Sequence, residues 1–195
     1  MSIKINEIAY YLPEQIITNE ELQERNPTWD LNMIEKRTGV VKRHVAYEHE
    51  TALDMSFETC KNLFSLHKEA QEKIDGIIFC TQSQDYIIPP NACILHKRFG
   101  WPDSVFALDI NMACSGYIYG LAIIQGLVST GVVKNALLVN ADTYSKYIHK
   151  KDRSASVLFG DGAAVSWISA SDKSSGLVDI QCETSGINYE RFIIP

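Results

Sequence analysis

The segment from Ser115 to Val128 places the strongest constraint on how this chain folds. It leaves almost no polar face, and Gln125 is its main polar residue. A helix that is apolar all round is buried on all sides. In a 195-residue α/β unit, helices usually lie on the outer faces of the sheet. We therefore expect a second subunit, or a second half of a longer protein, to cover this helix. Its apolar residues are Tyr117, Ile118, Tyr119, Leu121, Ala122, Ile123, Ile124, Leu127 and Val128.

The rest of the chain alternates short apolar runs with amphipathic segments. Thr51 and Asp54 form a capping-box pattern that opens one helix, and Asn91 opens another that stops at Gly100. Strands separated by helices imply crossover connections. The prediction is a single α/β domain over residues 1–195, with a mostly parallel mixed sheet and helices on both faces. The expected strands cover residues 3–9, 76–80, 105–110, 136–139, 163–168 and 177–182.

Composition excludes several classes of protein. Hydrophobic residues make up 46 % of the chain and charged residues 22 %, which excludes disorder. We find no apolar run of the roughly 18 residues that cross a bilayer, and no secretion signal, so we expect a cytoplasmic protein. The net charge is −6, and the densest basic stretch, residues 149–153, suits one small anion rather than a nucleic acid. No membrane partner is expected either.

Cysteine usage raises the question of a nucleophile. The five cysteines form no CxxC pair, so we expect neither structural zinc nor a disulfide framework. Cys114 follows a predicted strand and begins the apolar helix, where unpaired amides favour a thiolate and can bind an oxyanion. The same residue also fits a small core position, which is what buried cysteines usually occupy. The other cysteines (Cys60, Cys80, Cys93, Cys182) lie within helix or strand runs and fit core positions, and the histidines (His44, His49, His67, His96, His149) lack a base-like setting and are mostly expected to be solvated.

Several motifs together resemble beta-ketoacyl-acyl-carrier-protein synthase III, a condensing enzyme of the thiolase superfamily. The resemblance covers essentially the whole chain and identifies Cys114 as the nucleophile position. It implies the N-terminal, nucleophile-bearing half of a thiolase-like fold. The matching segments are residues 111–121 around Cys114, residues 11–15, residues 37–39 with 43–44, residues 89–93, residues 152–153 and residues 159–163.

The resemblance also assigns binding residues. Arg37 and Arg153 match positions that contact the nucleotide end of coenzyme A, although a surface salt bridge also fits either arginine. The family usually has tryptophan at the position of Met33, which puts coenzyme A affinity in question. Ile88 matches the loop residue that closes the acyl pocket of the partner in a homodimer. Three further residues match pocket-lining positions: Gln82, Tyr144 and Phe159. The bulk of Tyr144 and the polarity of Gln82 favour a short or oxygenated acyl group.

The implied activity is acyl transfer from acyl-coenzyme A to Cys114, followed by decarboxylative condensation with malonyl-carrier protein. Coenzyme A enters as a substrate, and no cofactor or metal is expected. The family places its catalytic His and Asn in a second half, to which no residue here corresponds, so this chain alone is expected to be inactive in condensation. We weigh three interpretations: the N-terminal half of a longer enzyme, a half-protein that joins a separate C-terminal chain, and a non-catalytic acyl or coenzyme A binding module. Specialised acyl transfer in secondary metabolism or lipid modification stays an alternative to fatty acid biosynthesis.

Overall fold

A five-stranded sheet forms the centre of the computed structural model, which describes residues 2–171, 176–177, 179–191 and 193. Its strand order is β1-β7-β6-β4-β5. The strands are β1 (Ser2–Tyr11), β4 (Gly76–Cys80), β5 (Phe106–Ile110), β6 (Asn135–Asp142) and β7 (Gly162–Ser171).

The sheet is mixed, as predicted, but parallel pairing does not predominate. β4 pairs parallel with both β5 and β6, whereas β7 pairs antiparallel with both β6 and β1. Helical crossovers join β4 to β5 and β5 to β6, which allows parallel pairing. The chain between β6 and β7 contains no long crossover helix and enters β7 at the end of the sheet where β6 stops, so β7 runs the opposite way.

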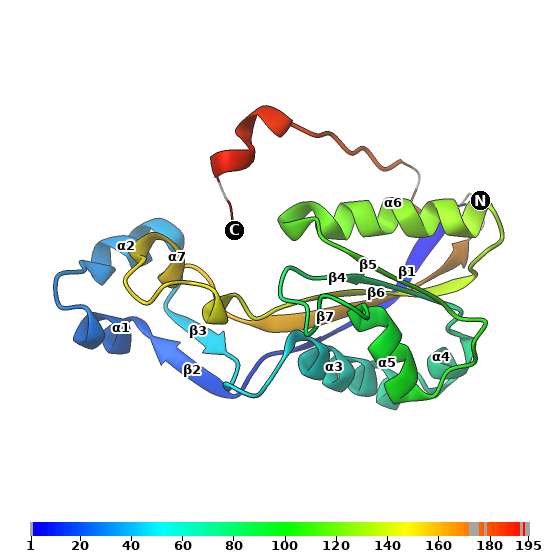
Figure 1. Cartoon of the computed structure of the whole chain (residues 1–195), viewed down its shortest axis with the longest axis horizontal. Helices are drawn as coiled ribbons and strands as arrows, with labels where there is room; N and C mark the ends of the chain where they lie inside the picture. The colour runs from blue at the N-terminus through cyan, green and yellow to red at the C-terminus, as the bar shows by residue number, and fades with distance from the viewer. Residues whose placement is uncertain (1, 172–175, 178, 192, 194–195) are drawn as a thin grey trace.

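Helices cover both faces of this sheet (Figure 1), as predicted. The helix α6 (Gly116–Ser129) lies on one face, and α3 (Ala52–Leu66), α4 (Lys68–Lys73) and α5 (Asn91–Phe99) lie on the other. Each face has its own apolar core, one built around Phe79 and Leu63 and the other around Ile78 and Ile124. The central strands β4 and β6 are therefore buried between two helical layers.

Local capping signals set the helix boundaries as the sequence predicts. Thr51 and Asp54 form the capping box at the start of α3. Gly100 ends α5 in the left-handed conformation, at φ 65°. At the other end of α5, the Asp109 carboxylate accepts hydrogen bonds from the amides of Asn91 and Ala92, at 2.7 and 2.8 Å. These two hydrogen bonds tie the end of β5 to the start of α5.

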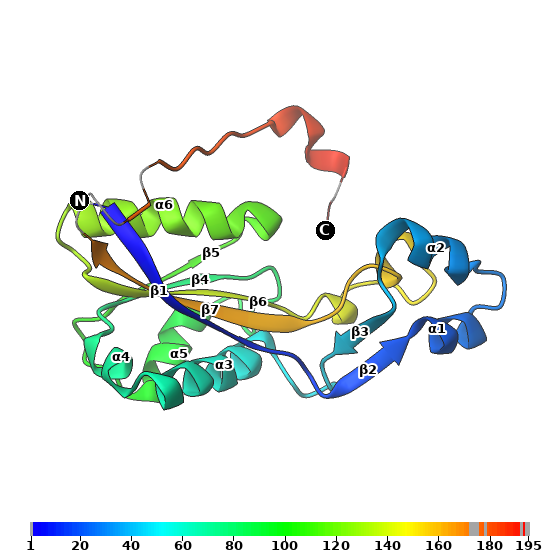
Figure 2. The same cartoon turned by 180° about the vertical axis from the view of Figure 1, so that it is seen from behind.

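A second lobe extends from one end of the sheet (Figure 2). It contains a two-stranded antiparallel sheet of β2 (Gln15–Thr18) and β3 (Lys42–Val45), and the helices α1 (Asn19–Arg25), α2 (Leu31–Thr38) and α7 (Arg153–Ser156). Its small core brings together Leu22, Leu31 and Val157. The lobe thus joins the segment after β1 to the segment between β6 and β7.

The structure corrects the expectation of a strand at residues 177–182. Leu177 makes a single isolated bridge with Ile3, and residues 179–182 form no strand; Val178 lies outside the described residues. The chain instead runs over α6, where the Tyr119 hydroxyl bonds the Glu183 carbonyl and the Thr184 hydroxyl, at 3.2 and 3.0 Å. Apart from the Leu177 bridge, the described residues of the expected strand have no backbone partner in the sheet.

Within this chain α6 is buried on one side only, so the expectation that a second subunit or a second half covers the helix stays a prediction. Leu121, Ile124 and Val128 are buried against the sheet, but Ile118 is 43 % exposed. The helix packs against the sheet with one side, and its Tyr119 side chain bonds residues 183 and 184. Among the described helices, none combines the length and the apolar character needed to cross a membrane.

Candidate active site

A strained turn presents Cys114 at the junction between β5 and α6. After β5 ends at Ile110, a short 3-10 helix (Ala113–Ser115) leads into α6. Ala113 has a φ of 46°, in the left-handed region that a residue with a Cβ rarely adopts. The Ser115 hydroxyl bonds the Met112 carbonyl at 2.8 Å and closes the turn. Such strain is typical of functional sites, and here it positions an exposed thiol at the start of a helix.

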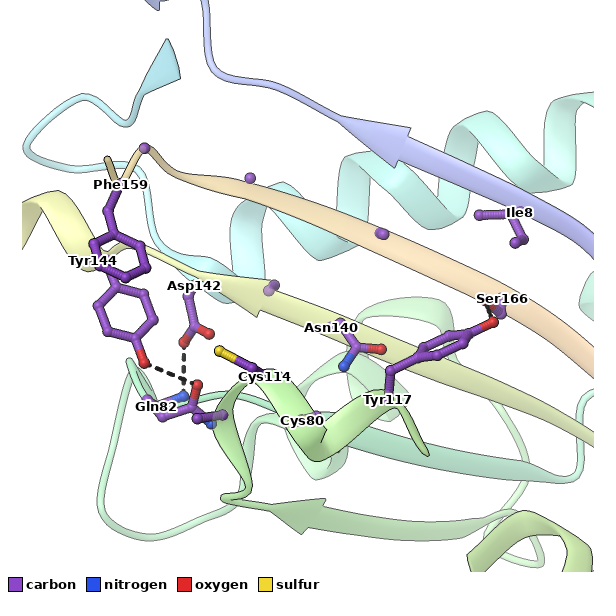
Figure 3. A pocket seen from close by; sticks show the side chains of 15 residues that line it. Ile8, Cys80, Gln82, Cys114, Tyr117, Asn140, Asp142, Tyr144, Phe159 and Ser166 are labelled. Atoms are coloured by element: carbon purple, nitrogen blue, oxygen red, sulfur yellow. Dashed lines mark hydrogen bonds between the residues drawn. The ribbon is translucent and has the colours of Figure 1, made fainter. Parts of the chain in front are cut away.

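Cys114 opens into a cavity of about 410 Å³, called here the Cys114 cavity. Its walls come from the ends of the central strands and from the start of α6 (Figure 3). The lining residues are Ile8, Cys80, Gln82, Ala113, Cys114, Tyr117, Asn140, Ala141, Asp142, Tyr144, Phe159, Gly160, Gly162, Ala164 and Ser166.

The three predicted pocket residues meet in this cavity. The Tyr144 hydroxyl donates to Gln82 Oε1 at 3.3 Å, and its ring stacks on Phe159 with centroids 5.3 Å apart. Burial and the nearby Asp142 carboxylate raise the pKa of Tyr144 to about 12. The phenol is therefore neutral at physiological pH and acts as a hydrogen-bond donor at one end of the cavity (Figure 3).

Asp142 is a site residue that the sequence analysis missed. Its Oδ1 accepts hydrogen bonds from the amides of Gln82 and Ser83, at 2.7 and 3.1 Å, and from the hydroxyls of Thr81 and Ser83, both at 3.1 Å. Burial raises the pKa of this carboxyl. Its position at the end of a predicted buried strand was the available signal, because strand ends commonly carry site residues.

The predicted coenzyme A residues lie outside the Cys114 cavity. Met33 and Arg37 are exposed on α2, and Arg153 is exposed as the first residue of α7. Both helices belong to the second lobe and lie near each other in both views. Ile88 is 81 % exposed on the loop between β4 and α5 and does not line the cavity. The structure thus brings Gln82, Tyr144 and Phe159 together at the Cys114 cavity. The other predicted residues lie outside it, on the second lobe (Met33, Arg37 and Arg153) and on the loop between β4 and α5 (Ile88).

The remaining cysteines and histidines have settings unlike that of Cys114. Cys60 and Cys80 are buried, as predicted, and burial raises the pKa of both thiols. The core position expected for Cys93 and Cys182 is wrong, because both are exposed. Exposure alone therefore does not distinguish Cys114; its turn and cavity do.

No histidine is found among the described residues that line the Cys114 cavity. His44 is half-buried, with Nδ1 2.6 Å from the Pro13 carbonyl, and His67 Nε2 lies 3.0 Å from Glu7 Oε2. These two are held by protein partners rather than by solvent alone. Asn140 is the cavity's one asparagine among the described residues.

The fold is that of the thiolase-like condensing-enzyme class, and it carries an exposed cysteine at the junction between β5 and α6. Residues 108–186 match the family model of 3-oxoacyl-[acyl-carrier-protein] synthase III. The chain is 36 % identical, over 94 % of its length, to beta-ketoacyl-[acyl-carrier-protein] synthase III 2 of Bacillus subtilis, and it covers 56 % of that protein.

Solved structures agree. A crystal structure of a 3-oxoacyl-(acyl-carrier-protein) synthase III superposes with a TM-score of 0.91 and 40 % identity, over 99 % of this chain and 58 % of the other. The crystal structure of the Thermus thermophilus synthase III superposes with a TM-score of 0.90 and 32 % sequence identity. The match covers 96 % of this chain and 57 % of the other. The chain belongs to the beta-ketoacyl-acyl-carrier-protein synthase III family. It spans little more than half the length of the relatives that it matches.

Proposed function

We propose that Cys114 accepts an acyl group from acyl-coenzyme A, as the first half-reaction of a synthase III. The observation that carries this proposal is the exposed thiol at the start of α6, opening into a cavity of about 410 Å³. Family membership supports the reaction class, and the local geometry supports Cys114 as the nucleophile.

The chemistry at Cys114 follows from its position. The Cys114 thiolate attacks the carbonyl carbon of the thioester, and the new S–C bond forms as the oxygen takes the negative charge. The Gly116 amide already donates to the Ala113 carbonyl, so the other amides of this first turn, together with the helix dipole, would stabilise the thiolate and this oxyanion. When the tetrahedral intermediate collapses, the bond to the coenzyme A sulfur breaks. That sulfur leaves as a thiolate and is protonated from solvent.

Arg37 and Arg153 would bind the phosphates of coenzyme A. A guanidinium pairs with phosphate through two parallel hydrogen bonds and can also stack on adenine. Met33 is 49 % exposed on the same helix as Arg37, where it can pack on the adenine ring, although less specifically than an aromatic side chain. We therefore expect binding of the nucleotide to depend mainly on the two arginines.

The cavity favours a short or oxygenated acyl group. Tyr144 and Phe159 place a stacked aromatic wall at one end. Gln82 offers polar atoms beside them, and its Nε2 is buried without a hydrogen-bond partner. A buried amide that lacks an acceptor is stabilised by an oxygen atom on the ligand.

Condensation needs groups that this part of the protein does not bring to Cys114. Decarboxylation of malonyl-carrier protein produces an enolate that the family's His and Asn stabilise. The described lining of the Cys114 cavity contains no histidine. We infer that a C-terminal half, in cis or in trans, supplies both groups, and that the active species is a homodimer in which the Ile88 loop approaches the partner. The chain of 195 residues should load an acyl group but not condense it.

The lack of a histidine in the described lining of the Cys114 cavity also favours a second candidate. This candidate is a module that binds acyl groups or coenzyme A without catalysing transfer. Met33 in place of the family's tryptophan agrees with that reading as well. The two candidates differ in one property, which is a covalent bond to Cys114.

Intact-mass spectrometry after incubation with acetyl-coenzyme A tests the proposal. We expect one added acetyl group, removed by hydroxylamine, and none on the Cys114→Ala variant. Cys93→Ala is the matched control, because Cys93 is also exposed but lies on α5, outside the cavity. Acetylation that persists in Cys114→Ala would overturn the assignment. Reversible binding of coenzyme A with no covalent product would establish the binding module instead.

A further inference from the structure

A second cavity, of about 630 Å³, lies between the second lobe and the segment that joins β6 to β7. We call it the Arg43 cavity. It shares Phe159 with the Cys114 cavity and no other lining residue. Met33, Arg37 and Arg153, the residues expected to bind coenzyme A, do not line it. Its lining residues are Ile17, Leu22, Arg25, Asn26, Arg43, Val45, Ser145, Ile148, Lys150, Lys151, Ser156 and Phe159.

The charges around this cavity all have one sign. Arg25, Arg43, Lys150 and Lys151 line it, and its described lining contains no aspartate or glutamate. This is unusual in a chain whose net charge is −6. A hollow surrounded by one sign of charge concentrates ions of the opposite sign.

Arg43 is the least expected of these cations, because it is only 4 % exposed. Its Nε donates to the Val157 carbonyl at 3.0 Å, and its Nη2 donates to Asn19 Oδ1 at 2.8 Å and also to the Val157 carbonyl. Its Nη1 is buried and has no hydrogen-bond partner. The guanidinium is therefore held rigidly by neutral oxygens, with one donor group unused.

No carboxylate among the described residues forms an ion pair with Arg43. Asp161 bonds Ser145, which lines the cavity, but its oxygens are occupied by the Ala46 amide at 2.8 Å and by the amide and hydroxyl of Ser145. Burial lowers the pKa of Arg43, with no opposing contribution from an acid. A buried, uncompensated charge is costly, and an anion nearby offsets that cost.

The other walls of the cavity define the rest of the ligand. Ile17, Leu22, Val45, Ile148 and Phe159 give it an apolar surface. Cavities of this size accept small organic molecules, which bury their apolar parts against such walls. A bare inorganic ion would leave that surface in contact with water.

We propose that the Arg43 cavity binds an organic anion with an apolar body and a carboxylate or phosphate head. The head lies among the basic side chains, where it compensates the Arg43 charge, and the body packs against the apolar wall. This site does not depend on acyl transfer to Cys114. Arg37 and Arg153 do not line it, although Lys151 and Ser156 lie close to Arg153 in the chain.

Titration of the isotope-labelled chain with hexyl phosphate, followed by NMR, tests the proposal. We expect the amide signals of Ser156 and Lys151 to shift, and those of Cys114 and Asn140 to stay. Hexanoate reports on a carboxylate head, so the ratio of its affinity to that of hexyl phosphate identifies the preferred head group. Hexanol and inorganic phosphate should each bind at least tenfold more weakly than the better of the two amphiphilic anions.

Variants separate this site from general attraction between charges. The exposed pair Lys150→Ala/Lys151→Ala should weaken binding by roughly fivefold, because exposed charges contribute modestly. The matched pair Lys73→Ala/Lys97→Ala, on α4 and α5, removes the same charge elsewhere and should leave binding unchanged. Arg43→Lys keeps a charge in the core and provides a second test, in which binding should fall further than in the lysine pair.

Three results would overturn the proposal. Hexanol binding as tightly as hexyl phosphate would remove the need for an anion, and inorganic phosphate binding as tightly would remove the need for an apolar body. Stoichiometric displacement of hexyl phosphate by coenzyme A would make the Arg43 cavity part of the substrate site. None of these results bears on acetylation of Cys114, so the two proposals fail separately.

Discussion

Gly116 lies directly against the thiol of Cys80: a Cβ at position 116 would be 2.1 Å from the Cys80 Sγ. Cys80 is buried at the end of β4, and Gly116 is the first residue of α6. This close approach lets the helix begin over the carboxyl end of the central strands. It therefore fixes where the neighbouring Cys114 is presented.

Gly116→Ala should destabilise the protein by about 1–3 kcal/mol, the usual cost of overpacking a filled core. The variant Cys80→Ala/Gly116→Ala should recover most of that loss, because the clash is with the sulfur, whereas the Cys80 Cβ lies at 3.4 Å. Urea unfolding of both single variants and the double variant measures the coupling free energy. Strictly additive effects would show that the contact is not the cause.

Sequence alone locates the Cys114 junction because its signals are local. An apolar strand, a cysteine and small residues before an apolar helix follow one another within a few positions. The capping residues Thr51 and Asp54 and the stop at Gly100 are likewise read from neighbouring residues, and the structure confirms them. Such signals depend on backbone hydrogen bonds within one turn.

Contacts between distant segments are less accessible from the sequence. Asp142 bonds Gln82 and Ser83, about sixty residues earlier, and this pairing follows from the parallel alignment of β4 and β6. Arg43 and Val157 meet in the same way, across 114 residues. The apolar run at residues 177–182 looks like a strand, yet the edge strand β1 pairs with it only at Leu177. Apolar alternation predicts a strand but does not supply a partner for it.

Asp142→Asn should flatten the dependence of stability on pH. Burial raises the pKa of Asp142 in the folded protein above its ordinary value of about 3.9, so the folded state holds the proton more tightly than the unfolded chain. The free energy of unfolding therefore falls as pH rises from that ordinary value through the raised one, and asparagine removes this contribution.

Thermal unfolding between pH 3 and pH 7 measures the effect. Asp103→Asn, at an exposed position, is the control and should reproduce the native profile. Some slope should persist in Asp142→Asn, because burial also raises the pKa of Asp109. A profile identical to that of the native protein would show that Asp142 ionises as freely as in the unfolded chain.

Tyr144→Ala should extend the range of acyl groups that Cys114 accepts. The stacked Tyr144 and Phe159 rings close one end of the cavity, so removing one ring makes room for several methylene groups. With acyl-N-acetylcysteamine donors of increasing length, we expect the native chain to prefer acetyl over octanoyl. The variant should acylate with octanoyl roughly tenfold faster than the native chain does, which is the discrimination that pocket methylenes usually provide. Tyr147→Ala, outside the cavity, is the control, and a native preference for medium chains would contradict the size argument.

The outer side of α6 should bind other apolar surfaces when the chain is studied alone. Ile118 and Leu108 are 43 % and 37 % exposed on this side of the sheet. Exposed apolar patches of this kind mark interaction surfaces, and in the family a second half would occupy this one. We expect the chain to self-associate at micromolar concentration and to bind a hydrophobic dye. Ile118→Glu should reduce both properties severalfold, because a charge opposes burial of the patch.

Leu66→Glu is the matched control: Leu66 is 74 % exposed, but it lies at the end of α3 on the opposite face. Sedimentation velocity measures the self-association of the native chain and of both variants, and dye fluorescence measures their exposed apolar surface. A native chain that stays monomeric and binds no dye would show that the outer side of α6 needs no covering partner.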